Sequence, residues 1–273
     1  MRKKLSLGKG VFAVPYAVIC VVFVVFPLIL VVAFAFRDPE KGSFSFSTIA
    51  DVLSNPSNYL SLLRTIGISL LATVICLLLA YPVAYILAAA PFNRIVVLAL
   101  LFVVPMWMNF MLRMFALQSI LNMIGISNTF WAAIIGLVYD FYPFMLLPIY
   151  TALSNLDRSY TEAAGDLGAN PFTTFLRTTL PLSVPGIVSG ITMVFMPCFS
   201  AYAITDVLGN PDTTIIGRKI AVLFELNEWE AGSALSLMLL VIMGIILLIG
   251  YLIRRFGKIK DNGTTTKAGG RMI

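Results

Sequence analysis

The stretch LDRSYTEAAGDLGANPFTTFLRTTLP, residues 156–181, is a polar insert between two long apolar segments, residues 130–154 and 182–205. Each apolar segment exceeds the ~20 residues that a helix needs to cross the roughly 30 Å hydrocarbon core of a bilayer. A polar insert between two such segments is expected to lie on one face of the membrane. The sequence around it therefore predicts a membrane protein with several spans.

Within this insert, local signals predict two short helices. Ser159 and Glu162 have the spacing of a capping box, which starts a helix, and Gly168 can end that helix because glycine accepts a positive φ. Asn170 is suited to cap a second helix, with Pro171 at its first position, where a missing N–H costs nothing. The second helix should run to residue 179, before the next span begins. We therefore expect a helix–turn–helix in the loop 155–181.

The composition of the whole chain indicates a membrane protein. Of its 273 residues, 59% are hydrophobic and 12% are charged, and the mean hydropathy is +0.95. Ordinary soluble domains carry roughly twice that charged fraction. Because a bilayer offers no water to the backbone, spanning segments should be helices. We expect an all-α polytopic membrane protein with six transmembrane helices, at residues 11–36, 65–90, 95–117, 130–154, 182–205 and 231–253.

The basic residues indicate the orientation. The net charge is +6, but lysines and arginines crowd into residues 1–10 and 254–273 rather than forming a patch typical of nucleic-acid binding. With both termini cytoplasmic, most of the 19 basic residues fall inside, as does the loop 155–181. We expect a cytoplasmic segment at 1–10, a transmembrane domain at 11–253 and a disordered basic tail at 254–273.

Several kinds of chemistry find no support in the sequence. The chain has no histidine, and its cysteines, Cys20, Cys76 and Cys198, lie in apolar runs without metal-ligand spacing. We interpret them as small buried hydrophobic residues. No Gly-x-x-x-x-Gly-Lys-Ser/Thr pattern occurs, so the chain has no phosphate-binding loop for ATP. We expect no catalytic residue, no metal site and no cofactor bound by this chain.

The insert resembles the EAA loop of ABC importer permeases. Glu162-Ala163-Ala164, Gly168 and the Leu-Pro at 180–181 have the family's spacing, although Thr178 stands where the family has isoleucine. The resemblance implies the type I importer permease fold, in which this loop forms a coupling helix that docks on an ATPase subunit. It also implies a multi-pass protein of the bacterial cytoplasmic (inner) membrane. The alternative for Glu162 is that it only closes the capping box. The coupling residues implied are Glu162, Ala163, Ala164, Gly168, Asn170 and Pro171.

Other stretches resemble the spermidine/putrescine importer permeases, in particular the first of their two permease subunits. They are residues 104–113 (VPMWMNFMLR), 135–139 (IGLVY), 142–144 (YPF) and 181–186 (PLSVPG). The resemblance implies import of polyamines together with a second permease subunit and an extracytoplasmic solute-binding protein. It also implies a cytoplasmic ABC ATPase dimer, which would bind ATP and Mg²⁺ in place of this chain. Asp206 falls where those permeases carry an aspartate.

A polycation crossing hydrocarbon requires carboxylates and aromatic faces along its route. Phe199, Tyr202 and Asp206 are spaced to share one helix face, which favours a substrate path there. The alternative is that Asp206 ends a helix at the outer interface, with the aromatic residues in an interfacial belt.

A second candidate for the path centres on Asp140, a carboxylate inside a predicted span, beside Tyr139. The alternative is that Asp140 pairs with Arg113 on the preceding span. Trp107 and Asn109 are further candidates for the path, although Trp107 could equally serve packing.

Two other functions remain open at this point. One is a permease for a different small solute, such as an amino acid or a metal chelate. The other is an ion-coupled secondary transporter, which would also be a proline-containing helical bundle with buried carboxylates. The sequence shows no internal repeat, and an EAA loop has no role in such a transporter.

Overall fold

Helices make up nearly all the regular structure in the computed structural model, which describes residues 14–38, 42–89 and 104–268. The chain divides into two units, one formed by residues 56–219 and the other by the described residues before 56 and after 219. The boundary falls inside helix α13 (Ile216–Glu225). The expected all-α fold class is confirmed.

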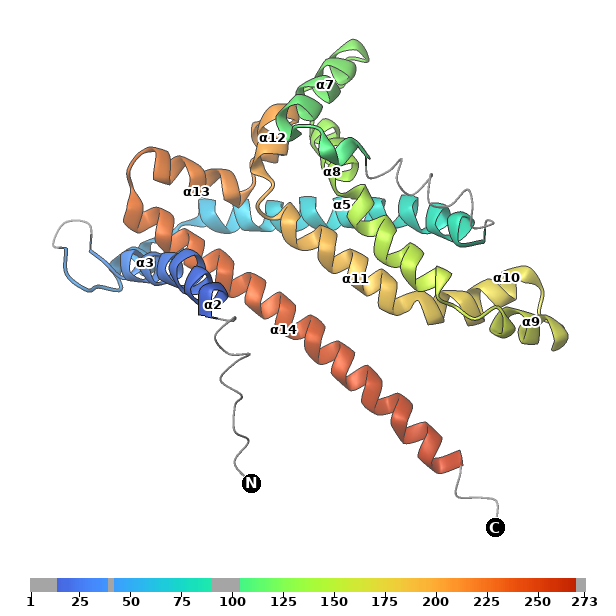
Figure 1. Cartoon of the computed structure of the whole chain (residues 1–273). Coiled ribbons are helices and arrows are strands. Elements are labelled where there is room, and N and C mark those ends of the chain that lie inside the picture. Colours follow the sequence, from blue (N-terminus) through green and yellow to red (C-terminus); the bar gives the residue numbers. More distant parts are fainter. Residues whose placement is uncertain (1–13, 39–41, 90–103, 269–273) are drawn as a thin grey trace, which may run out of the picture. The chain divides into compact units, whose positions relative to one another are not determined.

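The core of the larger unit is formed by α5 (Pro56–Ala89), α8 (Phe130–Ser154) and α11 (Leu180–Cys198), which pack along one another (Figure 1). On α5, fully buried small residues recur every fourth position, so they form one stripe along the helix. Small side chains let neighbouring backbones approach closely, which drives helix association within a bilayer. The residues of this stripe are Ala72, Cys76, Ala80 and Ala84.

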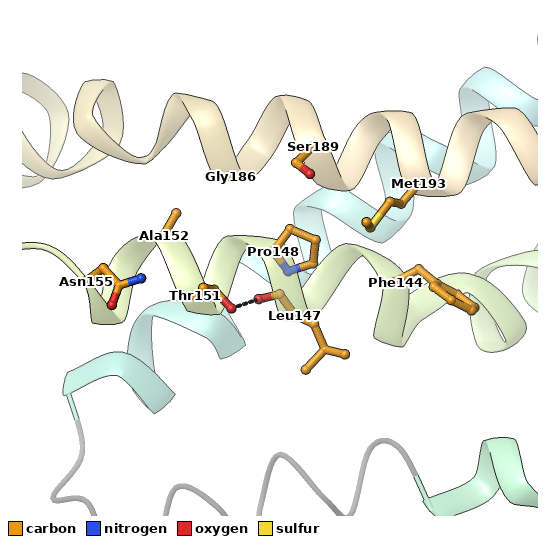
Figure 2. A pocket seen from close by; sticks show the side chains of 9 residues that line it. All are labelled: Phe144, Leu147, Pro148, Thr151, Ala152, Asn155, Gly186, Ser189 and Met193. Atoms are coloured by element: carbon orange, nitrogen blue, oxygen red, sulfur yellow. Dashed lines mark hydrogen bonds between the residues drawn. The ribbon is translucent and has the colours of Figure 1, made fainter. Parts of the chain in front are cut away.

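Two glycines on α11 set its distance from α8. A Cβ added to Gly186 would lie 2.7 Å from the Pro148 carbonyl oxygen, and one added to Gly190 would lie 2.7 Å from the Met145 sulfur. Along the same contact, an apolar groove of about 550 Å³ opens between α8 and α11. Figure 2 shows Pro148 and Ala152 of α8 facing Gly186 of α11 across this groove. The small-residue spacing of four is a recurring device of membrane helix pairs.

The two ends of the larger unit carry different elements (Figure 1). At one end lie α9 (Ser159–Asp166) and α10 (Pro171–Thr174), which connect α8 to α11. At the other end lie α7 (Phe110–Met123) and α12 (Tyr202–Leu208), followed by the short turn η5 (Pro211–Thr213). The Gln118 side chain ties α7 to α12 by donating to the Val207 carbonyl oxygen at 2.6 Å.

The smaller unit contains the first apolar helix, formed by α2 (Val14–Cys20), η2 (Val21–Val25) and α3 (Phe26–Ala35). Helix α14 (Trp229–Ala268) packs against α3 and α4 (Ser47–Ser54). After α3, an isolated bridge joins Arg37 to Phe44, and the Thr48 hydroxyl donates to the Arg37 carbonyl oxygen at 3.0 Å. This bridge orders the start of the loop between the first apolar helix and α4.

Two π-helical turns in the described part of the chain each precede a proline. The turn η2 ends two residues before Pro27, and the turn η4 (Phe175–Thr179) ends two residues before Pro181. A proline ring clashes with the carbonyl four residues earlier, and a wider turn relieves that clash.

The second helix of the insert was expected to end near 179. Instead, α10, η4 and α11 continue as one apolar segment over Pro171–Cys198.

Five helices in the described part of the chain are long and apolar enough to cross a membrane, so the expected six stay a prediction. The missing one, at 95–117, lies outside the described residues up to 103. The described part of this expected span, residues 104–117, is not one helix, because the turn η3 (Val104–Trp107) is followed by a new helix that begins at Phe110. Asn109 caps that helix by accepting from the Met111 and Leu112 amides. The prediction of one helix over 95–117 was therefore wrong, whereas the third crossing itself stays a prediction.

Helix α14 covers the expected last span and continues to Ala268, through a stretch that we expected to be disordered. Extending an existing helix adds a backbone hydrogen bond for each residue fixed, without a new nucleation cost. Residues 269–273 of the expected tail and residues 1–10 lie outside the described residues.

Candidate functional site

The helix–turn–helix between α8 and α11 begins differently from the predicted capping box. Asp157 accepts a hydrogen bond from the Ser159 amide through Oδ1 at 2.9 Å, and Ser159 is the first residue of α9. This bond lowers the pKa of Asp157 below its ordinary value. The prediction of Ser159 as the cap was wrong, because α9 already begins at Ser159, and the amide of Ser159 itself donates to the aspartate two residues earlier.

The turn and the second helix start as predicted. Gly168 has a φ of +80°, and the amide of Ala169 donates to the Ala164 carbonyl oxygen at 3.0 Å, which closes α9 with a glycine-dependent turn. Asn170 accepts from the Thr173 amide at 2.8 Å, and Pro171 is the first residue of α10. Each signal acts over three to five residues, so the sequence alone defined this geometry.

The hairpin formed by α9 and α10 exposes large apolar side chains. Leu167 is 89% exposed, Phe172 is 70% exposed and Tyr160 is 56% exposed. The side chains of Glu162 and Ala163 are also exposed, whereas Ala164 is half-buried. Prominent apolar residues among polar ones are typical of interfaces with other proteins. Sequence reasoning missed these three residues, although apolar side chains within a polar insert are a signal that could have found them.

Inside the larger unit, Arg113 of α7 meets Asp140 of α8. The Arg113 Nη2 atom lies 2.6 Å from Asp140 Oδ1, and both residues are buried. The guanidinium also lies over the ring of Tyr139, with its central carbon 5.9 Å from the ring centroid. The structure thus supports the pairing alternative for Asp140.

Two further residues that we predicted to line the path lie where η3 is followed by α7. Trp107 ends η3, and Asn109 immediately precedes α7. Trp107 is 84% exposed at the end of η3. Asn109 is also exposed, and its side-chain oxygen caps α7. A capping role satisfies amides that have no partner within the helix, so the type and position of Asn109 have a local structural cause.

Phe199, Tyr202 and Asp206 do not share one helix face, so this prediction was wrong. Helix α11 ends at Cys198, and α12 begins at Tyr202. Two tight turn bonds close α11, from the Phe199 and Ser200 amides, and Ala201 leaves the helical region with a ψ of 41°. Phe199 is fully buried, so its ring packs inside the protein.

Asp206 instead pairs with a residue near the start of α13. Its Oδ2 atom lies 3.1 Å from Arg218 Nε, and both side chains are about one-third exposed. Gly217, the residue before Arg218, lets α13 lie close to the break between α11 and α12. A Cβ there would lie 3.3 Å from the Phe199 carbonyl oxygen and 3.5 Å from the Tyr202 ring. Sequence reasoning missed Arg218, because no local spacing rule joins an aspartate to an arginine across a loop.

Next to this pair, Lys219 fastens α13 to the start of α5. Its Nζ donates to the Ser57 carbonyl oxygen at 2.8 Å and to the Ser57 hydroxyl at 2.7 Å. Burial lowers the pKa of Lys219 below its ordinary value, and the nearby charge of Arg64 adds to this effect. The end of the unit that carries α12 and α13 is thus held by several polar contacts.

Comparison with known proteins places these features in a family. The family model described as binding-protein-dependent transport system inner membrane component matches residues 6–257. The spermidine/putrescine transport system permease protein PotB of Escherichia coli (strain K12) is 34% identical over 84% of this chain and 91% of that protein. PotB of Haemophilus influenzae is 34% identical over 84% of this chain and 88% of that protein. The inner membrane ABC transporter permease protein YdcU of Escherichia coli is 28% identical over 60% of this chain and 62% of that protein.

Two solved structures have the same fold. A bacterial ABC transporter involved in the import of the acidic polysaccharide alginate matches with a TM-score of 0.66 at 18% identity, covering 92% of this chain and 98% of that chain. A bacterial alginate ABC transporter in complex with alginate pentasaccharide-bound periplasmic protein matches with a TM-score of 0.73 at 15% identity, covering 91% and 94%. The chain therefore belongs to the family of binding-protein-dependent transport system inner membrane components, the multi-pass permeases of ABC importers.

Proposed function

We propose that this chain forms half of the translocation path of an ATP-driven importer for polyamines such as spermidine and putrescine. The observation that carries the proposal is the 34% identity to PotB permeases over 84% of the chain. In chemical terms, the proposal is supported by the carboxylates of Asp140 and Asp206, which lie on helices that also carry tyrosines, since these groups suit an alkylammonium ion. The importer would comprise this chain, a second permease, a cytoplasmic ATPase dimer that holds ATP and Mg²⁺, and an extracytoplasmic solute-binding protein.

We propose that the hairpin of α9 and α10 couples the permease to the ATPase. Leu167 and Phe172 would insert into the ATPase as apolar anchors, because exposed apolar side chains gain most from burial at an interface. The exposed Glu162 and Ala163 would contact the ATPase together with the partly exposed Ala164. Gly168, Asn170 and Pro171 would hold the hairpin in shape. The hairpin and both termini would then be cytoplasmic, as the distribution of basic residues favours.

Among the candidates for the path, we propose Asp140 with Tyr139 and Asp206 with Tyr202 as the substrate-contacting pairs. Each pair places a carboxylate and a phenol on the same helix, and Tyr139 already has a cation over its ring. Trp107 is exposed enough to contribute a further aromatic face. Phe199 and Asn109 are better assigned to packing and to helix capping, as their burial and hydrogen bonds indicate.

Co-purification of the ATPase tests the coupling role. The variants Leu167→Glu and Phe172→Glu should each abolish its retention on the tagged permease, because a charge would replace an apolar anchor. The matched control is Leu226→Glu, which alters an exposed leucine after α13, and it should retain the ATPase. Full retention by both hairpin variants would refute the docking site.

Uptake by whole cells tests the substrate class. Labelled spermidine uptake should be lost in cells that lack this gene and return when the gene is restored. Excess putrescine should compete, whereas amino acids and sugars should not. Uptake that is unchanged by the deletion, in cells without a second polyamine system, would refute the polyamine assignment and leave the family membership intact.

A further inference from the structure

The ion pair between Arg113 and Asp140 is buried but incompletely satisfied. One hydrogen bond of 2.6 Å joins Nη2 to Oδ1. The Arg113 Nε atom is also buried and has no hydrogen-bond partner in the described part of the chain. A guanidinium has five N–H donors, and a buried pair stabilises a fold only when its remaining donors are satisfied. This ion pair is therefore expected to stabilise the packing of α7 against α8 only weakly.

The pair also lies on a helix that has few polar ties to the rest of the unit. Figure 1 shows α7 projecting beyond the core helices α5, α8 and α11. The Gln118 contact to α12 and the Arg113 contact to α8 are the polar side-chain ties of α7 that the structure describes. Breaking the ion pair would remove one of them and weaken the attachment of α7 to α8, while Met114 and Leu121 of α7 stay packed in the core.

An exposed face of α8 leads to this pair. Trp131, Ile135 and Tyr139 are exposed at four-residue intervals, so they form one stripe along the helix. Tyr139 ends the stripe directly beside Asp140 in sequence, and its ring carries the Arg113 guanidinium. A cation that moved along this stripe would reach the ring and the carboxylate together.

We propose that Asp140 is a cation-exchange site, at which one ammonium group of the substrate displaces the Arg113 guanidinium from the carboxylate. This inference rests on the proposed polyamine function. The ammonium would donate to the Asp140 carboxylate and lie over Tyr139, the place that the guanidinium occupies in the structure. The carboxylate keeps a cationic partner throughout, so the cost of an unpaired buried charge is avoided.

The exchange gives Arg113 a role that favours release as well as entry. The displaced guanidinium stays nearby on its long side chain and competes to return to Asp140. That competition keeps the substrate weakly bound, as a translocation site requires. While the substrate ammonium is bound, α7 has lost its tie to α8, which couples occupancy of the site to the position of α7.

The first test is chemical rescue in the assembled transporter, held in nanodiscs without the solute-binding protein. Arg113→Gln should lower its thermal stability, and 1,4-diaminobutane should restore it, whereas 1,4-butanediol should not. Because removal of a competing group raises the competent fraction of a site, half-maximal stabilisation should need about tenfold less diamine than in the wild type. The double variant Arg113→Gln/Asp140→Asn should lose this rescue. An equal diamine response in the single and double variants would overturn the proposal.

The second test does not depend on assembly of the single variant. Arg113→Gln/Asp140→Asn replaces the ion pair by two neutral amides and should assemble, yet its spermidine uptake should fall about tenfold. The control Arg64→Gln/Asp212→Asn neutralises a solvent-exposed pair at 3.8 Å and should transport like the wild type. Wild-type uptake by the first double variant would overturn the exchange site. Absence of spermidine uptake by the wild-type importer would instead refute the polyamine function, and the diamine rescue would still report on Asp140.

Discussion

Gly186 of α11 lies against Ala152 of α8 so closely that a Cβ on the glycine would clash with the alanine Cβ. The Pro148 carbonyl oxygen would lie 2.7 Å from the same atom. A backbone oxygen cannot move aside without moving its helix. The separation of α8 and α11 is therefore set by the absence of a side chain at this position.

Replacing Gly186 by alanine should force these two helices apart. We expect Gly186→Ala to cost about 1–3 kcal/mol of stability, the range for overpacking a tight core. The measurement is the thermal midpoint of the purified transporter. Gly67→Ala is the matched control within α5, because a Cβ there meets no described atom within 4 Å. If Gly186→Ala were as stable as Gly67→Ala, the close packing of α8 and α11 would be wrong.

The Thr65 hydroxyl connects α5 to the first residue of α13. It accepts from the Ile216 amide at 2.8 Å and donates to the Ser61 carbonyl oxygen at 2.7 Å, and Thr65 is fully buried. Thr65→Val keeps the shape but leaves a buried amide unpaired, which should cost about 1–3 kcal/mol. Thr151→Val, at an exposed hydroxyl that bonds within its own helix, should be nearly neutral. Thermal unfolding compares the two, and equal midpoints would contradict the tie between α5 and α13.

Gly168 should be sensitive to substitution because of its backbone alone. Its φ is +80°, and a Cβ there meets no described atom within 4 Å. Gly168→Ala should therefore strain the turn by roughly 1–2 kcal/mol without a steric clash. The result should be a misdirected hairpin and weaker retention of the ATPase, measured by co-purification. Gly165→Ala, within α9 and equally open, should retain the ATPase, so a loss in both variants would point to another cause.

Protonation of Asp157 should loosen the start of α9. The pKa of this carboxyl is lowered in the folded chain by the Ser159 amide, so its stabilising effect is present above the ordinary value of 3.8. That effect is lost as the pH falls through the lowered value. A spin label at Tyr160 should be immobile near neutral pH and become mobile only at strongly acidic pH. Asp157→Ala should be mobile at every pH, whereas Asp157→Asn should keep the cap, and a mobile Asp157→Asn would contradict this role.

Short-range chemistry made much of the hairpin and one span predictable. The span at 130–154 coincides with α8, and Gly168, Asn170 and Pro171 act where predicted. These signals depend on a few consecutive residues or on apolar length. For the same reason, the sequence identified the family through the spacing of Glu162 and Gly168.

The predictions from sequence failed where a neighbouring group or a segment distant in sequence determines the local structure. Ser159 is not the cap, because α9 begins at Ser159 and the amide of that residue donates to Asp157. The path residues Phe199 and Asp206 were separated by a break after Cys198, where α13 packs through Gly217. The pairing of Asp206 with Arg218 depends on that tertiary arrangement. A spacing rule assumes one continuous helix and cannot detect such a break.

The most direct test of the central claim is ATP-dependent uptake of labelled spermidine by proteoliposomes that contain the complete importer. We predict accumulation only when ATP and the solute-binding protein are both supplied, and its loss when this chain carries Leu167→Glu. Accumulation that follows an imposed ion gradient without ATP would contradict the account, because it would identify an ion-coupled transporter in place of an ATP-driven permease.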